Sequence, residues 1–191
     1  ATLERMTPAT GPIAGRPASE LARLPLTAGD GAGIPTLAEA VRAAGNAPLL
    51  IEIKDQDGAL GPAPGPLPAA VAADLAGHGG PVAVMSFNPH AIAAMVGAAP
   101  DVPRGLTTCA FDAAHWPALP SHRRAHLAAM ADLPRLDAAF ISHDARDLGS
   151  PAVAAARAAG HAVLCWTIRG PEAEARARRV ADNITFEGYL P

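Results

Sequence analysis

Short apolar runs alternate with alanine-rich helical segments along most of the chain, and this alternation limits the possible folds more than any other feature. Six of the runs have the length of a β-strand, and the segments between them carry helix start and stop signals. Strands that alternate with helices are typical of a parallel sheet covered by helices. We therefore predict an α/β fold with strands at residues 48–54, 81–87, 104–108, 138–142, 162–167 and 183–186.

Capping residues indicate where the intervening helices begin. Thr36 and Glu39 form a capping-box pattern, in which each side chain accepts a hydrogen bond from the other residue's backbone amide. Asn88, Ser150 and Gly170 each precede a proline, which suits the first position of a helix. The predicted helices are one that follows Thr36 and ends at Gly45, then residues 67–76, 89–96 (stopped by Gly97), 122–131, 151–159 (stopped by Gly160) and 171–180.

Polar residues at the strand ends favour a barrel over an open sheet. In a barrel these ends meet at one mouth, whereas in an open sheet only those at the switch point converge. A (β/α)8 TIM barrel usually takes about 250 residues, and the part before Thr36 contains turns but no strand pattern. We therefore expect a TIM barrel whose first strands are missing from this chain, with an open doubly wound sheet of six strands as the alternative. The polar residues are Glu52, Lys54, Ser86, Thr107, Thr108, Ser142, His143, Trp166, Thr167, Thr185 and Glu187.

A barrel that lacks its first strands has two open edges. The runs at residues 48–54 and 183–186 would form these edges, with unpaired backbone amides and carbonyls. We predict that both edges are exposed or paired with another copy of the chain.

Lys54 is the most informative single residue, because it is the only lysine among 15 cationic side chains. A lysine retained among arginines suggests a place that requires a compact point charge rather than a planar fork. Glu52 lies two residues earlier on the same strand, so both side chains share one face, about 7 Å apart along the strand. The pair is either a buried ion pair or a metal-binding carboxylate beside a phosphate-binding lysine.

Charge and hydropathy exclude two classes of protein. The net charge is −3, so no basic field would attract nucleic acid. Apolar runs are too short for an integral membrane segment, which needs about 18 residues. Cys109 and Cys165 both lie in apolar stretches and are expected to be small buried side chains, with a disulfide or a nucleophilic cysteine as alternatives.

Three further patterns carry weaker signals. The glycine-rich segment 29–33 follows no strand, and a helix face exposed to solvent explains His122 and His126 better than a zinc motif does. Ser142, His143 and Asp144 have the letters of a catalytic triad, but neighbours on a strand point to opposite faces and cannot form that relay.

Four segments resemble the glycerophosphodiester phosphodiesterase family, the phospholipase-C-like phosphodiesterase barrels, in order and spacing. They are Ile34-Pro35-Thr36-Leu37-Ala38-Glu39, Leu50-Ile51-Glu52-Ile53-Lys54, Ser86-Phe87-Asn88-Pro89 and Trp166-Thr167-Ile168. In addition, residues 2–7 are similar to the stretch that follows the family's His-Asp motif. The resemblance covers the whole chain as one partial barrel domain, residues 1–191.

The resemblance implies metal-dependent hydrolysis of a small-molecule glycerophosphodiester to an alcohol and glycerol 3-phosphate. It implies Glu52 and Lys54 as catalytic residues, with Glu52 as a ligand of Mg²⁺ or Ca²⁺ and Lys54 as the phosphate contact. Ser86, Phe87 and Trp166 match positions that line the mouth and bind substrate. Glu187 stands near the place of an aspartate in the family's closing motif.

The resemblance also implies that part of the catalytic machinery is absent. The family's His-Arg-Gly motif, its Glu-x-Asp metal pair and its second histidine precede the segment that matches residues 2–7. We therefore expect this chain alone to be inactive, because hydrolysis needs an acid and a base. The alternatives are a catalytically dead barrel that serves as a binding or structural module, and an open-sheet enzyme that shares only the strand–helix rhythm.

Overall fold

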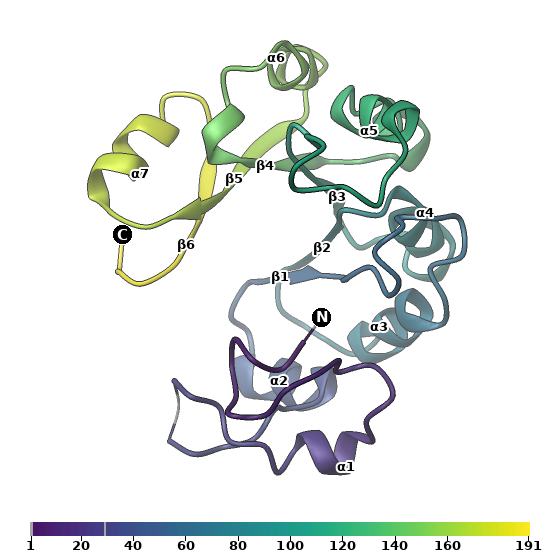
Figure 1. The fold of residues 1–191 in the computed structure, drawn as a ribbon, viewed down its shortest axis with the longest axis vertical. Coiled ribbons are helices and arrows are strands. Elements are labelled where there is room, and N and C mark those ends of the chain that lie inside the picture. The colour runs from purple at the N-terminus through teal and green to yellow at the C-terminus, as the bar shows by residue number, and fades with distance from the viewer. Residues whose placement is uncertain (1, 29) are drawn as a thin grey trace.

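The computed structural model describes residues 2–28 and 30–191, and it contains one sheet of six parallel strands. The strands follow an arc, and helices α3 to α7 lie on its outer side (Figure 1). All six strands were expected, and two have the predicted bounds. The strands are β1 (Leu49–Glu52), β2 (Val82–Ser86), β3 (Arg104–Thr108), β4 (Phe140–Asp144), β5 (Ala162–Ile168) and β6 (Asn183–Phe186).

The strand order runs from β1 to β6 along the chain without reversal. A doubly wound sheet reverses its strand order at the switch point, so the open-sheet alternative is wrong. Parallel strands joined in sequential order by outer helices are the arrangement of a barrel wall. The described residues therefore form an α/β half-barrel.

The two edges of this wall are the strands expected there. β1 pairs only with β2, and β6 pairs only with β5, among the described residues. Each edge also exposes a large apolar side chain: Leu50 is 41% exposed and Phe186 is 43% exposed. The prediction that these runs form the two edges of the sheet is confirmed, and their pairing with another copy stays a prediction.

The helices begin largely where the capping signals place them. The Glu39 amide donates to Thr36 Oγ1 over 3.2 Å, and the Thr36 amide donates to Glu39 Oε2 over 2.8 Å, which completes the capping box of α2 (Leu37–Ala44). Asn88 Oδ1 accepts from the His90 amide at the start of α4 (Pro89–Ala98). The other helices are α1 (Ala18–Leu21), α3 (Leu67–Leu75), α5 (Ser121–Ala128), α6 (Pro151–Ala158), α7 (Pro171–Ala177) and the short 3₁₀ turns η1 (Leu133–Leu136) and η2 (Ala145–Asp147).

Several predicted boundaries are wrong; for example, α5 and α7 end three residues earlier than expected, and two other differences have a clear physical reason. Gly97 lies inside α4, because a glycine costs a helix only about 0.5–1 kcal/mol relative to alanine and does not have to end it. β4 starts two residues later than expected, since Asp137 ends η1 in a left-handed conformation. The strand then continues to Asp144, which pairs with Trp166 on β5.

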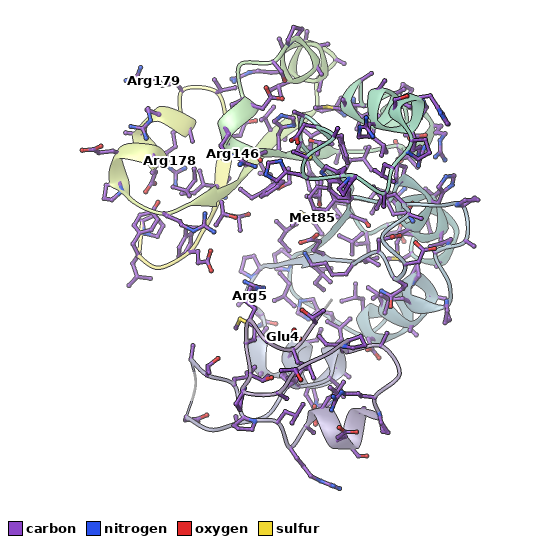
Figure 2. All side chains as sticks on the ribbon, viewed as in Figure 1. Glu4, Arg5, Met85, Arg146, Arg178 and Arg179 are labelled. Carbon is purple, nitrogen blue, oxygen red and sulfur yellow. The ribbon has the colours of Figure 1, made fainter. Side chains whose placement is uncertain are left out.

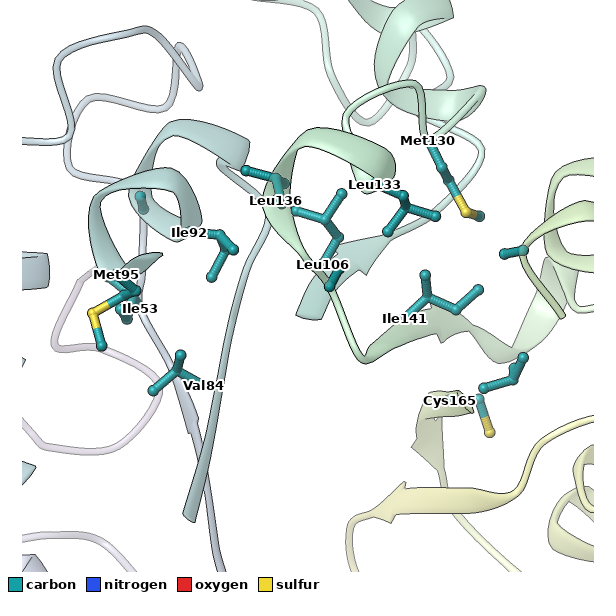
Figure 3. Close-up of a cluster of buried hydrophobic side chains, with 14 of the residues drawn as sticks. Ile53, Val84, Ile92, Met95, Leu106, Met130, Leu133, Leu136, Ile141 and Cys165 are labelled. Atoms are coloured by element: carbon teal, nitrogen blue, oxygen red, sulfur yellow. The ribbon is translucent and has the colours of Figure 1, made fainter. Parts of the chain in front are cut away.

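The main core lies between the sheet and its outer helices (Figure 3). Cys165 belongs to this core, and Cys109 lies in a smaller cluster formed by loops at the carboxyl ends of the strands. Both cysteines are buried and unbonded to each other, as expected for small core side chains. The smaller cluster consists of Leu60, Cys109, Phe111, Leu119 and Leu127, with Phe87, Trp116, Ala128 and Trp166 packed against it.

The amino-terminal segment packs as irregular structure rather than as a barrel strand. Leu3 is 1% exposed, and Thr2 and Pro12 form an isolated antiparallel bridge. Gly29, the first residue of the glycine-rich segment, lies outside the described residues, as does Ala1. No described helix is both long enough and apolar enough to cross a membrane.

Candidate functional site

A cavity of about 870 Å³ lies on the inner side of the arc. Its walls come from the carboxyl ends of the strands and from the amino-terminal segment. Figure 2 shows Met85 of β2 and Arg5 of that segment, which both line this main cavity. From the strand ends, its lining residues are Glu52, Lys54, Asp55, Met85, Phe87, Thr107, Trp166, Thr167, Thr185, Phe186 and Glu187.

Glu52 and Lys54 both line the main cavity. The strand predicted to extend to Lys54 ends at Glu52, so Lys54 lies two residues beyond β1 and not on it. Lys54 Nζ lies 2.6 Å from Glu52 Oε2. The glutamate side chain is 21% exposed, whereas that of the lysine is 57% exposed, so the pair is not a closed interior ion pair. The ammonium therefore remains accessible to a ligand in the cavity.

The second carboxylate oxygen of Glu52 has no protein partner. Oε1 is buried and accepts no hydrogen bond. A buried anionic oxygen without a partner is costly unless something else compensates its charge. A hard divalent cation would do so, since Mg²⁺ and Ca²⁺ prefer carboxylate oxygens.

The surrounding residues supply only part of a metal site. Within residues 2–28 and 30–191, no group of three or more histidine, cysteine, aspartate or glutamate side chains is arranged to hold an ion. Glu52 thus fits a metal ligand by its orphaned oxygen, but the described chain does not complete the coordination shell.

The end of β1 is held by a side-chain network that sequence reasoning missed. Asp55 Oδ1 accepts from Asn88 Nδ2 over 2.7 Å, and Asp55 Oδ2 accepts from the Leu60 amide over 3.2 Å. Gln56 Nε2 donates to the Lys54 carbonyl over 2.6 Å. These bonds hold the carbonyl of Lys54 and the residues that follow it. The sequence does contain one signal for this network, because Asp55 is an acidic residue directly after Lys54.

Phe87 and Trp166 form an aromatic wall of the cavity. Their rings lie 5.6 Å apart in an edge-to-face arrangement, which is favourable for aromatic pairs. The Trp166 indole N–H donates to the Ser142 carbonyl over 2.9 Å, so the indole has a fixed orientation. Thr107 also lines the cavity, and its buried hydroxyl has no hydrogen-bond partner.

Ser86 differs from the other expected site residues. Its side chain is fully buried and does not line the main cavity. The hydroxyl donates to the Ile53 carbonyl over 2.6 Å and accepts from the Asn88 amide over 3.0 Å. The first bond connects β2 to the residue after β1, and the second is local to the turn between β2 and α4.

Glu187 lines the opposite side of the main cavity from its place after β6. Its Oε2 accepts from Arg169 Nη2 over 2.8 Å, and Oε1 lies 3.9 Å from Arg5 Nη1. The two arginines already compensate its charge, so Glu187 differs in this respect from Glu52. Arg5 belongs to the stretch of residues 2–7 that resembles the family, but the sequence predicted no place in the site for its side chain.

The weaker motifs are not part of this cavity. His143 contacts Thr108 and Asp147 rather than Ser142, so no triad relay forms. His126 pairs with Asp132 over 2.9 Å on a side of α5 that is partly exposed, as a solvated helix face predicts. Within the described residues, no histidine lines the main cavity.

Comparison with known proteins gives one family. The sequence profile of the glycerophosphoryl diester phosphodiesterase family matches residues 1–183. No curated protein matches the chain.

Several solved structures share the fold. An Oleispira antarctica phosphodiesterase in complex with the product sn-glycerol-3-phosphate is 25% identical, with a TM-score of 0.69 over 97% of this chain and 72% of that chain. A glycerophosphodiester phosphodiesterase from Agrobacterium tumefaciens is 25% identical, with a TM-score of 0.61 over 97% of this chain and 74% of that one. A Silicibacter pomeroyi protein of 21% identity has a TM-score of 0.73 over 95% and 68% of the two chains. Because the profile match spans nearly the whole sequence, this chain belongs to the glycerophosphoryl diester phosphodiesterase family.

Proposed function

We propose that the main cavity is the phosphate-binding part of a site that hydrolyses glycerophosphodiesters to an alcohol and glycerol 3-phosphate. Family membership and the product held by the Oleispira antarctica relative support this proposal. The observation that carries it is the state of the Glu52–Lys54 pair. One ammonium remains accessible beside a carboxylate oxygen that has no partner.

Lys54 is the residue that would hold the phosphate. Its ammonium has three N–H donors, and Glu52 Oε2 accepts one of them, which leaves two for phosphate oxygens. A positive charge placed there stabilises negative charge that builds up on the phosphoryl oxygens in the transition state. The bonds of Asp55 and Gln56 hold the lysine backbone in place for that role.

Glu52 would hold a divalent cation, Mg²⁺ or Ca²⁺, through its free oxygen Oε1. Such an ion supplies Lewis-acid stabilisation of the phosphoryl oxygens when it is bound. Glu52 meanwhile orients Lys54 through its other oxygen.

Phe87 and Trp166 would cover the carbon skeleton of the substrate and exclude water on that side of the cavity. Thr107 offers an unpartnered hydroxyl at the same wall. Ser86, which the sequence places among the substrate-binding residues, would act through Phe87, since its hydroxyl is fully used by backbone groups.

A second candidate function is that of a catalytically inactive module that binds glycerol 3-phosphate. In this case residues 1–191 form one partial barrel domain. General acid–base catalysis needs a proton donor for the leaving alkoxide. Among the described residues, the main cavity contains no histidine to supply that proton. We infer that the chain alone binds glycerol 3-phosphate but does not turn over a diester.

Two measurements on the same preparation test these functions. Calorimetric titration with sn-glycerol 3-phosphate, with glycerol as the uncharged control, reports phosphate binding. An assay of glycerol 3-phosphate release from glycerophosphocholine, with Mg²⁺, with Ca²⁺ and with chelator, reports turnover. Binding without turnover supports a phosphate site that lacks its proton-transfer groups, and chelator-sensitive turnover shows that the chain is a complete enzyme. Absence of both contradicts the proposed function.

A further inference from the structure

A second cavity of about 510 Å³ lies beside the main one and shares the Trp166 side chain with it as a wall. It is formed by the loop after β3 and by the turn after β4. Its lining residues are Cys109, Ala110, Asp112, His115, Trp116, Asp144, Arg146, Asp147 and Trp166.

The second cavity carries an excess of negative charge. Three carboxylates line it, against one guanidinium and one imidazole. Arg146 is held by Asp144, with contacts of 2.5, 3.0 and 3.1 Å, and His115 Nδ1 lies 2.9 Å from both oxygens of Asp112. Arg146 and His115 therefore each already contact one carboxylate. Asp147 is the carboxylate left over.

Asp147 is oriented by a buried histidine that carries no charge. His143 Nε2 lies 3.3 Å from Asp147 Oδ2, and His143 Nδ1 lies 2.8 Å from Thr108 Oγ1. Burial lowers the pKa of His143, although Asp147 opposes that shift. The neutral ring donates to Asp147 and accepts from Thr108. The carboxylate is thus fixed in place but not neutralised, and its side chain is 39% exposed.

Two tryptophan side chains complete the lining of the second cavity. Trp116 packs near Phe87, with ring centroids 5.3 Å apart, and Phe87 packs in turn on Trp166. Tryptophan is the aromatic side chain that binds organic cations best, and aromatic walls with a carboxylate are the usual way to hold a quaternary ammonium group. A metal ion is a poorer fit, because no group of three ligands is arranged for one in the described chain.

We propose that the second cavity binds the cationic alcohol group of the diester, a quaternary ammonium group such as that of choline. This inference rests on the proposed function and gives its site a substrate class. Because Trp166 lines both cavities, we take it as the side chain along which the alcohol of a diester bound at Lys54 extends from one cavity to the other. Trp116, Trp166 and Asp147 would then surround the positive charge.

The chain contains its own reporter for this site. Its two tryptophans, Trp116 and Trp166, both line the second cavity, so intrinsic fluorescence reports occupancy directly. Titration with choline should quench or shift this emission in a saturable way. The neutral carbon analogue of choline, in which carbon replaces the quaternary nitrogen, should bind about tenfold or more weakly because it has the shape without the charge.

Two variants measure separately what the charge of Asp147 and the ring of Trp116 contribute to choline binding. Asp147→Asn keeps the size and removes the charge, and should weaken choline binding about tenfold. Asp74→Asn makes the same change on the exposed face of α3 and should have no effect. Trp116→Leu should weaken choline binding about threefold to thirtyfold, with Trp166 still reporting. It also serves as the test if Asp147→Asn does not fold.

A matched pair of diesters links the two cavities. Glycerophosphocholine should bind about tenfold more tightly than glycerophosphoglycerol, whose headgroup is neutral, and Asp147→Asn should abolish that difference. Equal binding of choline and its neutral analogue, or unchanged binding in both variants, would overturn the inference. Choline binding in a protein that does not bind glycerol 3-phosphate would leave this site standing and overturn the proposed function. Binding of glycerol 3-phosphate without binding of choline would overturn this inference and leave the proposed function standing.

Discussion

At the scale of single residues, the two oxygens of Glu52 do different things. One pairs with Lys54 and the other is buried without a partner, although both belong to one carboxylate at the end of β1. A pair that served only the stability of the fold would be expected to satisfy both oxygens, because an unsatisfied buried acceptor costs about 1–3 kcal/mol. The arrangement is better explained by a ligand that supplies the missing partner.

Glu52→Gln tests this interpretation. The amide keeps the shape of the side chain but is a weaker ligand for a hard cation, so Ca²⁺ affinity should fall about tenfold or more. Titration calorimetry with Ca²⁺ measures the change, and Glu172→Gln on the exposed surface of α7 is the matched control. Identical Ca²⁺ affinity in wild type and Glu52→Gln would show that Glu52 is not a metal ligand.

His143 makes stability depend on pH. Burial lowers its pKa below the ordinary value of 6.5, so between that value and the lowered one the unfolded chain binds a proton that the folded chain does not. The free energy of unfolding should therefore decrease as the pH falls below about 6.5. Urea unfolding at pH 7 and pH 5.5 should show this loss, and His143→Gln should reduce it.

Another histidine, His90, also contributes to the pH dependence of the free energy of unfolding. Burial also lowers the pKa of His90 at the start of α4, with help from Arg123 and Arg135. The carboxylates with lowered pKa values, such as Asp144, lose their contribution only at more acidic pH. An unchanged slope in His143→Gln would mean that His143 is not kept neutral in the fold.

At the scale of elements, β3 and β4 are in close contact at a position that has no side chain, Gly105. A Cβ atom on Gly105 of β3 would lie 2.5 Å from both the ring and the backbone carbonyl of Phe140 on β4. The backbone cannot yield as a flexible side chain would. The glycine is therefore needed for the contact between these two strands, which hold Thr107, Thr108 and His143 in position.

Gly105→Ala should consequently destabilise the fold by about 1–3 kcal/mol, the usual cost of overpacking. Gly97→Ala in α4 is the control, because a Cβ there meets nothing within 4 Å. That substitution should stabilise the fold by about 0.5–1 kcal/mol through better helix propensity. Urea denaturation of both variants measures the difference, and similar stabilities would contradict the packing argument.

The sequence predicted elements better than it predicted side-chain contacts. All six strands and the capping box at Thr36 could be found, because short apolar runs and capping residues are local sequence signals. The spacing of Glu52 and Lys54 also placed both in one cavity. The bonds of Ser86 and the position of Arg5 could not be found, because they depend on which strand lies next to which. The end of β4 was missed because its last residues are polar and its pairing with β5 is not local.

At the scale of the whole molecule, the described chain is a barrel wall with two unpaired edges. β1 and β6 each have one strand neighbour, and the amino-terminal segment covers the cavity between them without joining the ladder. Amides on the outer side of an edge strand exchange with solvent faster than those in the middle of a sheet.

Hydrogen exchange should show this difference. Amides of β3 and β4 should be the best protected, whereas unpaired amides in β1 and β6 should exchange much faster. Measurements at two protein concentrations separate a monomer from copies that pair at their edges. Full protection of both edge strands in a monomer would contradict the half-barrel.

The central claim is that the main cavity binds a phosphate through Lys54, and the affinity of sn-glycerol 3-phosphate for Lys54 variants tests it most directly. Lys54→Ala should weaken binding about tenfold to a hundredfold, the loss expected for a hydrogen bond to a charged group. Lys54→Arg should not restore it, because the larger planar fork does not replace a compact ammonium beside Glu52. Arg176→Ala, on the exposed surface of α7, should bind like wild type. Wild-type affinity in Lys54→Ala would show that the lysine only stabilises Glu52 and that the phosphate site lies elsewhere.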